Sequence, residues 1–252
     1  IENEELKGID LLLSLPSYST TDSLVRATLL QQFELCGVRV VNSFASTMIA
    51  KNKITSLQLL AKNKVPIPRT YAIHSSEHMN DMLEDIGRFP VIVKSVVGSL
   101  GIGVAIIESK RGLRSIADMM IESNNSHPLL LQEYIKESSG KDIRVFVVGN
   151  KIVAAMDRIA VTRGEFRSNF SLGGKVKIAE LTDKEKKMAI KATRVCGLDY
   201  AGVDLIRSKE GTKVLEINSN PGFKGITEAA GADVAGKIID YMVALVKKKK
   251  KK

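Results

Sequence analysis

The chain has 252 residues, of which 44% are hydrophobic and 26% are charged, which is typical of a globular protein with a sizeable core. No apolar run approaches the ~18 residues of a membrane span, the acidic segment Ile1–Glu5 does not resemble a signal peptide, and two cysteines are too few for a disulfide framework. The net charge is +10, but six positive charges form the run Lys247–Lys252, so we expect a disordered lysine tail on a cytoplasmic protein that does not associate with membranes.

The N-terminal part of the chain has the pattern of an α/β unit. A strand, a helix and a second strand are expected at Ile9–Leu15, Asp22–Gly37 and Val38–Val41. A further helix is expected over Ser46–Lys64, where apolar residues recur at helical spacing and Pro66 ends the pattern.

The remainder alternates strands, mostly joined as hairpins, with single helices. Strands are expected at Pro90–Val97, Val104–Glu108, Leu129–Ile135, Asp142–Val148, Lys151–Arg158, Ala201–Ile206 and Lys213–Ile217. Helices are expected at Arg111–Ser123, Thr182–Cys196 and Val234–Val246. The turn Gly149-Asn150 marks a hairpin, and Thr182 with Glu185 forms a capping box. Hairpins interrupted by helices predict α+β lobes after an α/β start.

A glycine-rich loop lies between two predicted strands. Gly98, Gly101 and Gly103 allow the backbone to approach a phosphate closely, so several N–H groups can point at one anion. Lys94 lies in the apolar strand that enters this loop, where a lysine needs an anionic partner. The pair favours a flexible flap over nucleotide phosphates, although a plain glycine-rich hairpin would show the same loop.

Three oxygen-bearing side chains fall on two predicted neighbouring strands. Glu216 and Asn218 share one face of a strand because they are two residues apart, and a hairpin places Asp204 on the adjacent strand. Hard oxygen ligands of this kind suit Mg²⁺ that also contacts substrate phosphates. The alternative is a solvated polar face, with Leu205, Ile206, Leu215 and Ile217 forming the buried face.

A basic loop follows the first hairpin. It contains Arg163, Arg167 and Asn169 after Arg158, and guanidinium groups suit phosphate and carboxylate anions. A solvated basic loop would have the same composition.

Taken in order, these motifs resemble the ATP-grasp superfamily, and within it the RimK group of glutamate ligases. The resemblance runs from about Ile9 to Tyr241. It rests on the lysine and glycine flap together with five further motifs, which are Gln-Glu133-Tyr134-Ile135, Lys-Asp142-Ile-Arg-Val, Phe-Arg167-Ser168-Asn169, Gly-Val-Asp204 and Glu216-Ile-Asn218-Ser-Asn-Pro-Gly.

The resemblance implies two α+β lobes that clasp ATP, preceded by a partial α/β lobe. Relatives carry a longer N-terminal lobe than the segment seen here. The expected divisions are a partial N-terminal lobe at 1–50, a central lobe with the flap at 51–129, a C-terminal lobe with the metal site at 130–246, and the tail at 247–252.

The resemblance also implies roles for individual residues. Glu133, Tyr134 and Ile135 would meet the adenine and Asp142 the ribose. The phosphates would be contacted by Lys53, Lys94 and the flap residues Gly98, Ser99, Gly101 and Gly103. Arg167 and Asn169 would be catalytic, with Ser168 beside them at the nucleotide. Asp204, Glu216 and Asn218 would hold two Mg²⁺ or Mn²⁺ ions.

The implied activity is ATP-dependent carboxylate–amine ligation through an acyl phosphate. The implied substrates are L-glutamate and a protein or peptide C-terminus such as that of ribosomal protein S6, and a homo-oligomer is compatible with the family. Three other acceptors remain open: an amino-group carrier protein, a pterin or deazaflavin cofactor, and a small peptide. Readings of other classes are an inactive nucleotide-binding subunit and a basic nucleic-acid-binding module. Scarce aromatic residues, at 5%, disfavour the nucleic-acid module.

Overall fold

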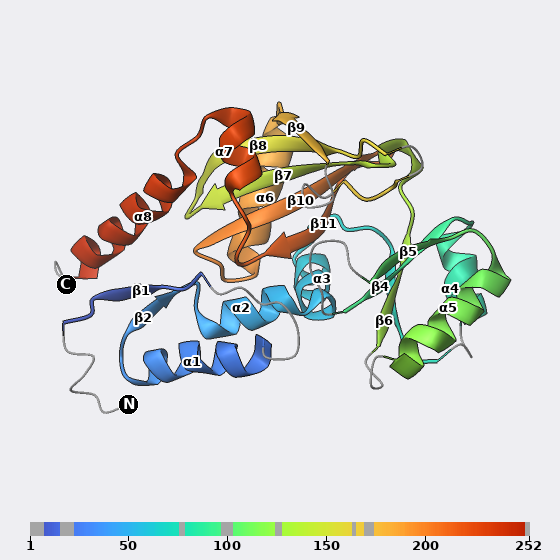
Figure 1. The fold of residues 1–252 in the computed structure, drawn as a ribbon, viewed down its shortest axis with the longest axis horizontal. Helices are drawn as coiled ribbons and strands as arrows, with labels where there is room; N and C mark the ends of the chain where they lie inside the picture. The colour runs from blue at the N-terminus through green and yellow to red at the C-terminus, as the bar shows by residue number, and fades with distance from the viewer. Residues whose placement is uncertain are drawn as a thin grey trace.

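The chain forms three β-sheets with helices packed against them (Figure 1). The computed structural model describes residues 8–15, 23–75, 79–96, 103–123, 128–162, 165–168 and 174–249. None of the helices in those ranges is long and apolar enough to cross a membrane.

The N-terminal part is a small parallel unit. Strands β1 (Leu11–Leu13) and β2 (Arg39–Val41) pair in parallel and are joined through helix α1 (Ser23–Leu35). Two short helices follow, α2 (Phe44–Lys51) and α3 (Lys53–Lys62). The single helix predicted over Ser46–Lys64 is therefore wrong, because the chain breaks at Asn52. The Asn52 side chain accepts a hydrogen bond from the backbone N–H of Thr55 and so caps α3.

A four-stranded antiparallel sheet forms the middle of the molecule. Its order is β3 (Thr70–Ile73), β6 (Leu129–Glu133), β4 (Val91–Ser95) and β5 (Val104–Ile107). Helices α4 (Met79–Ile86) and α5 (Lys110–Ser123) pack against one face, where Val91, Val93 and Leu131 are buried. Because side chains alternate along a strand, Ile92 and Lys94 of β4 point to the opposite face.

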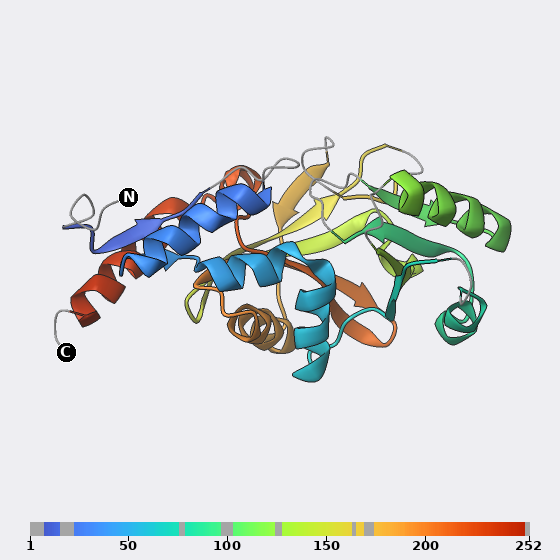
Figure 2. The ribbon, with the colours of Figure 1, turned by 90° about the horizontal axis from the view of Figure 1, so that it is seen from below.

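A five-stranded antiparallel sheet forms the C-terminal part. Its order is β11 (Gly211–Asn218), β10 (Tyr200–Ser208), β7 (Lys141–Val148), β8 (Lys151–Ile159) and β9 (Lys175–Ile178). A short 3₁₀ helix, η2 (Lys136–Ser138), precedes β7, and helix α6 (Asp183–Val195) covers one face. Figure 2 shows α6 lying beside α3 on that face. Helices α7 (Lys224–Ala230) and α8 (Val234–Lys249) complete the chain.

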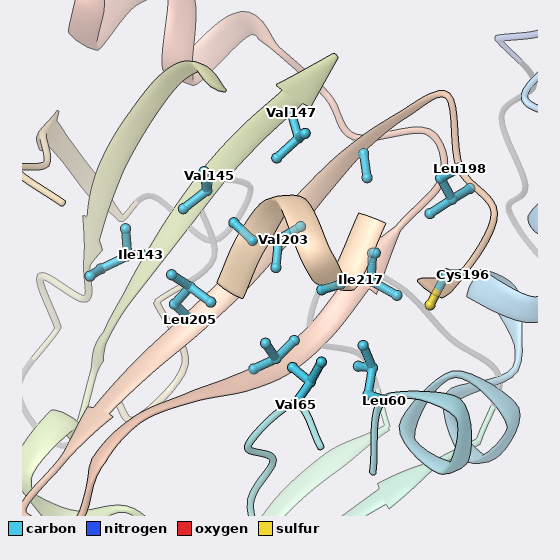
Figure 3. Close-up of a cluster of buried hydrophobic side chains, with 14 of the residues drawn as sticks. Leu60, Val65, Ile143, Val145, Val147, Cys196, Leu198, Val203, Leu205 and Ile217 are labelled. Atoms are coloured by element: carbon cyan, nitrogen blue, oxygen red, sulfur yellow. The ribbon is translucent and has the colours of Figure 1, made fainter. Parts of the chain in front are cut away.

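The largest core lies between the five-stranded sheet and helices α6 and α3. Figure 3 shows Val145, Val203 and Ile217 of the sheet facing Cys196 and Leu60. Cys196 is therefore a core residue, and burial raises the pKa of its thiol to about 12. The opposite face of this sheet remains for other contacts, and its charged residues form one wall of the site described below.

A buried amide fixes the N-terminal unit to the five-stranded sheet. The Nδ2 group of Asn42 donates to the carbonyls of Tyr200 and Ser219 at 2.9 and 2.8 Å. Its Oδ1 atom accepts from the N–H groups of Asp199 and Tyr200 at 2.7 and 3.2 Å. These bonds satisfy the whole amide, so the end of β2 and the loop after β11 hold a fixed relation.

Most predicted elements are present, and the differences have physical causes. The 149–150 hairpin and the Thr182 capping box are confirmed. Five elements were not predicted, namely β3, α4, η2, β9 and α7. All five are short, so few residues carry their periodicity. The prediction of a disordered tail from residue 247 is wrong at its start, since α8 continues through Lys249.

Candidate active site

A cleft opens between the four-stranded and five-stranded sheets. The space between its walls, including the part open to solvent, is about 960 Å³. Ten of the predicted site residues line it: Lys53, Lys94, Glu133, Tyr134, Ile135, Asp142, Arg167, Ser168, Asp204 and Glu216. Gly98, Ser99, Gly101 and Asn169 lie outside the described residues. Gly103 immediately precedes β5, and its carbonyl accepts a hydrogen bond from the N–H of the cleft residue Ser95 at 2.9 Å.

Lys94 is a buried cation on the four-stranded wall. Its side chain points into the cleft from β4, and its Nζ atom donates to Oε1 of Gln132 at 2.9 Å. Burial, opposed by the charge of Glu216 and assisted by that of Lys53, lowers the pKa of Lys94 to about 8. An ammonium group that is bound by a neutral amide keeps its attraction for an incoming anion.

Lys53 reaches the same cleft because of the helix break at Asn52. It is the first residue of α3, and its backbone N–H donates to the carbonyl of Val96 at 3.3 Å. That bond joins the start of α3 to the end of β4, one residue beyond the strand that carries Lys94. The two lysines therefore come from separate elements that are fixed to one another.

The segment Glu133–Ile135 crosses between the two sheets and lines the cleft as it does so. It leaves β6 at Glu133 and enters η2 at Lys136. A crossing segment offers backbone N–H and C=O groups that are not used by a strand ladder, which suits hydrogen bonding to the edge of a planar base.

The five-stranded wall holds a buried network of opposite charges. Arg158 of β8 donates to both oxygens of Asp142, at 2.6 and 2.5 Å, and to Oδ2 of Asp204 at 2.8 Å. Arg144 of β7 also donates to both oxygens of Asp204, with NH2 at 2.8 Å from Oδ2. All four side chains are buried. Burial works against a charged Asp204, but the two guanidinium groups hold its pKa below the usual range.

Close packing beside this network explains the glycine in Gly-Val-Asp204. A Cβ atom on Gly202 would lie 2.6 Å from Cβ of Pro221 and 2.9 Å from Cδ of Arg144. Because Gly202 has no side chain, Pro221 in the loop after β11 and the aliphatic part of Arg144 can both pack against β10 at this position. Arg144 is thereby held against the strand that carries Asp204.

Glu216 and Asn218 lie on the strand next to Asp204. Asp204 pairs with Glu216 in the β10–β11 ladder, and Nδ2 of Asn218 donates to Oε1 of Glu216 at 3.0 Å. A bulge between Asp204 and Leu205 shifts the register, so Leu215 and Glu216 both face the cleft. Leu205 and Ile217 lie in the core, as the alternative of a solvated polar face expects, but Ile206 and Leu215 line the cleft instead.

Arg167 lies at the cleft in an ion pair with its own loop. Its Nε and NH2 groups donate to the two oxygens of Glu165 at 2.9 and 2.7 Å. This pairing lowers the pKa of Glu165 to about 2. The loop is fixed to the start of β7 because the N–H of Gly140 donates to the carbonyl of Phe166 at 3.2 Å. Arg167 is thus present at the cleft with a carboxylate already bound.

The donor chemistry fits a hard divalent cation. The trio of Asp204, Glu216 and Asn218 supplies carboxylate and amide oxygens from adjacent strands, as Mg²⁺ prefers. Asp204 uses three of its roughly four lone-pair positions on guanidinium groups and keeps one on Oδ1. Among the described residues no group of three or more His, Cys, Asp or Glu could hold a metal, and the predicted trio contains only two carboxylates.

Sequence reasoning missed the arginines of the buried network. Arg144 lies within the Lys-Asp142-Ile-Arg-Val motif but receives no role from it, and Arg158 is predicted only as part of a basic loop. A signal was present, because Asp142 and Arg144 alternate with apolar residues in a strand whose other side is core. Charged residues at every second position of a buried strand indicate a face that binds opposite charges.

Comparisons with known proteins agree with this architecture. Residues 50–242 match the family described as RimK-like ATP-grasp domain. A probable alpha-L-glutamate ligase from Methanococcoides burtonii is 39% identical over 243 residues, which cover 96% of this chain and 78% of that protein.

Two solved structures share the fold at low sequence identity. The D-alanine–D-alanine ligase from Bacillus anthracis complexed with ATP has a TM-score of 0.74 at 20% identity, covering 98% of this chain and 85% of that one. The ATP-grasp ligase PsnB, complexed with a minimal precursor, Mg and ADP, has a TM-score of 0.67 at 24% identity, covering 89% and 68%. With its ATP-grasp fold and its match to the family over most of its length, the chain belongs to the RimK-like ATP-grasp family.

Proposed function

We propose that this protein is an ATP-dependent α-L-glutamate ligase, which joins glutamate to an amine or carboxyl acceptor through an acyl phosphate. The proposal rests on one observation above all. A single cleft brings Lys53 and Lys94 on one side opposite Asp204 and Glu216 on the other, with the crossing segment 133–135 between them. The similarity to a probable alpha-L-glutamate ligase supports glutamate as the amino acid that is added.

The nucleotide would lie along the cleft from the crossing segment to the acidic trio. The backbone of Glu133–Ile135 would meet the base, with Tyr134 beside it, and Asp142 would meet the ribose. Lys94 and Lys53 would bind the phosphates, together with the flap that contains Gly98, Ser99, Gly101 and Gly103. In this arrangement the two lysines meet the most negative part of ATP.

Asp204, Glu216 and Asn218 would hold two Mg²⁺ or Mn²⁺ ions. When bound, such ions neutralise charge on phosphate oxygens and so favour phosphoryl transfer. The observation that supports this assignment is the remaining lone pair on Asp204 beside the Glu216–Asn218 pair.

Catalysis would consist mainly of positioning and charge stabilisation. A carboxylate is a poor acyl donor until its oxygen carries the γ-phosphoryl group, after which an amine can attack the carbon. Arg167, with Ser168 and Asn169 beside it, would hold the transferred phosphoryl group, and Glu165 would have to release Arg167 first. The buried arginines Arg144 and Arg158 would hold Asp204 and Asp142 in fixed positions, so the wall would not need to reorganise during the reaction.

The division into lobes follows from this function. We place the partial N-terminal lobe at 1–50, the lobe that carries the lysines and the flap at 51–129, and the lobe that carries the acidic trio at 130–246. Closing the second lobe on the third would exclude the water that hydrolyses an acyl phosphate.

The test is ADP release by the full chain with ATP, Mg²⁺ and glutamate, measured across acceptors and followed by product mass. A peptide with the C-terminal sequence of ribosomal protein S6, an amino-group carrier protein and a deazaflavin cofactor are the acceptors to compare. We expect ADP release that needs both glutamate and one acceptor, and a product heavier by whole glutamate residues. ADP release with an acceptor but with no added glutamate would contradict the proposal, as would nucleotide binding without any turnover.

A further inference from the structure

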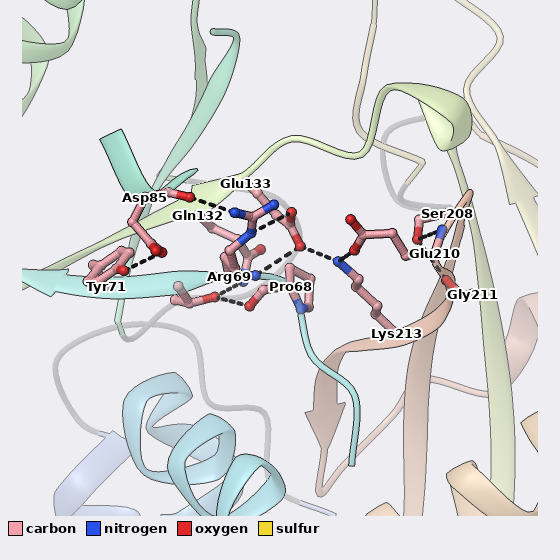
Figure 4. Close-up of polar contacts among 11 residues, drawn as sticks. Pro68, Arg69, Tyr71, Asp85, Gln132, Glu133, Ser208, Glu210, Gly211 and Lys213 are labelled. Atoms are coloured by element: carbon pink, nitrogen blue, oxygen red, sulfur yellow. Dashed lines mark hydrogen bonds and ion pairs between the residues drawn. The ribbon is translucent and has the colours of Figure 1, made fainter. Parts of the chain in front are cut away.

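A cluster of charged side chains joins the two sheets directly behind the crossing segment (Figure 4). At its centre is Glu133, whose side chain is 11% exposed. Lys213 of β11 approaches from the five-stranded sheet, and its Nζ atom lies 2.5 Å from Oε1 of Glu133. Arg69 approaches from the segment between α3 and β3, and its Nε atom lies 3.5 Å from Oε2 of Glu133.

Backbone contacts tie the same three segments together. The N–H of Arg69 donates to Oε1 of Glu133 at 2.9 Å, and the N–H of Glu133 donates to the carbonyl of Arg69 at the same distance. The N–H of Val214, next to Lys213, donates to the carbonyl of Pro66 at 2.7 Å. Lys213 thus acts at the point where the two segments that connect the sheets run side by side.

Lys213 is held as a charged group at this position. It is as buried as Glu133, and its Nζ atom also lies 2.9 Å from Oε2 of the exposed Glu210. Burial works against the ammonium form, but the hydrogen bonds to Glu133 and Glu210 raise the pKa of Lys213. A lysine that is buried and paired in this way fixes its partner, because without it the Glu133 carboxylate would keep only the longer ion pair and the backbone bond to Arg69.

The cleft lies immediately on the other side of these residues. Glu133 itself lines it, and so does Ile206, which pairs with Lys213 in the β10–β11 ladder. Leu215, two residues after Lys213, lines it too. The cluster therefore sets where the backbone of 133–135 stands relative to the apolar wall formed by Ile206 and Leu215.

We propose that Lys213 is a positioning residue for nucleotide binding, which fixes the crossing segment 133–135 by holding the Glu133 carboxylate and so sets the affinity for the base. This inference rests on the proposed function, in which the base of ATP meets that segment. It predicts that a change at Lys213 lowers the affinity for a nucleotide but not the affinity for a phosphate chain without a base, because Lys213 acts only on the base end of the cleft.

The experiment compares ADP with tripolyphosphate, which has no base, by calorimetry on the full chain. Lys213→Met should weaken ADP binding by about tenfold, equivalent to the loss of one charge-assisted hydrogen bond's contribution of about 1.4 kcal/mol. Tripolyphosphate binding should stay within about twofold, and Lys213→Arg should restore ADP binding to within about threefold. Lys209→Met, at an exposed lysine in the same β10–β11 turn, is the matched control and should match the unaltered chain.

A second variant covers the case in which Lys213→Met does not fold. Arg69→Met removes the guanidinium group from the other side of Glu133, at a side chain that is 48% exposed. It should also weaken ADP binding without changing tripolyphosphate binding, but by only about threefold.

The outcomes separate the two claims. If the unaltered chain binds neither ADP nor tripolyphosphate, the proposed function fails and this inference falls with it. If the unaltered chain binds ADP, two results would overturn the positioning role alone. One is ADP affinity within twofold in both folded variants, and the other is equal weakening of ADP and tripolyphosphate.

Discussion

The two walls of the cleft treat charge in opposite ways. On the five-stranded wall, Asp142 and Asp204 are each bound by guanidinium groups, and Arg158 joins the two carboxylates. On the four-stranded wall, Lys94 is equally buried but is bound by the neutral amide of Gln132. The first wall has its charges paired within the protein, whereas the second has a buried cation whose side-chain hydrogen bond goes to a neutral amide.

This difference separates two jobs that active-site charges perform. Compensated charges cost little to keep in place, so they can form a rigid framework around a reaction. An uncompensated charge is costly to bury, and here burial lowers the pKa of Lys94 to about 8. We expect changes on the first wall to appear mainly in stability, and changes on the second wall mainly in nucleotide affinity.

The largest effect should come from removing Arg158. Arg158→Met removes the ion-pair partner of Asp142 and one of the two guanidinium groups that bind Asp204. Leaving a buried charge without its partner costs about 3–5 kcal/mol of folding free energy. Urea unfolding with a matched Lys237→Met control measures this. Lys237 forms an exposed ion pair with Asp240, so its loss should cost less than about 1 kcal/mol. Equal stability of the two variants would show that the network does not hold the wall together.

Glu216→Gln should have the next largest effect, on turnover instead of stability. Glu216 faces the cleft with the amide of Asn218 as its hydrogen-bond partner, and it forms no ion pair like those of Asp142 and Asp204 within the described residues. Loss of one such charge at a reacting phosphoryl group costs about 10²-fold in rate. ADP release in the presence of glutamate and acceptor measures this, with Glu84→Gln on α4 as the control. Turnover within threefold of the unaltered chain would remove Glu216 from the metal assignment.

The sequence predicted those parts of the fold that depend on neighbouring residues, and it did not predict those that depend on tertiary contacts. Local signals were sufficient for the hairpin at Gly149-Asn150 and for the cap at Thr182, because turns and caps depend on neighbouring residues. The break at Asn52 was not predictable in the same way. Asn52 lies in a stretch whose apolar residues recur at helical spacing, so its N-cap preference alone did not mark the break between α2 and α3.

The same distinction applies to the site. Periodicity predicts which face a residue occupies, and it placed Glu216 and Asn218 together beside Asp204. It does not predict partners across strands, so the bonds of Arg144 and Arg158 to Asp204 could not be foreseen. The bulge that turns Leu215 and Glu216 to one side also depends on the pairing of two strands, because nothing in Val-Leu-Glu-Ile-Asn itself requires an irregular register.

Lys94→Met should weaken nucleotide binding without destabilising the fold, in contrast to Arg158→Met. Loss of a charge-assisted contact to phosphate costs about tenfold or more in affinity for ADP. Stability should change by less than about 1 kcal/mol, because removing a buried ammonium offsets the loss of its bond to Gln132. Calorimetry with ADP and urea unfolding give the two values, with Lys151→Met, at an exposed position in the first hairpin, as the control. A variant that binds ADP normally but unfolds easily would reverse the assignment of the two walls.

The smallest effect should be a pH dependence of ADP binding that belongs to Lys94. Its pKa of about 8 in the free chain means that the ammonium form is lost as the pH rises through 8, and with it the attraction for phosphate. ADP affinity should therefore fall by about threefold between pH 7.5 and 8.5, measured without metal ions. Burial also lowers the pKa of Lys51 to about 8, so the source must be identified by substitution. Lys94→Arg keeps the positive charge at every pH in this range and should abolish the dependence. If the dependence persists in Lys94→Arg, the titrating group is not Lys94, and the contact of that lysine with a neutral amide does not distinguish the four-stranded wall from the five-stranded wall.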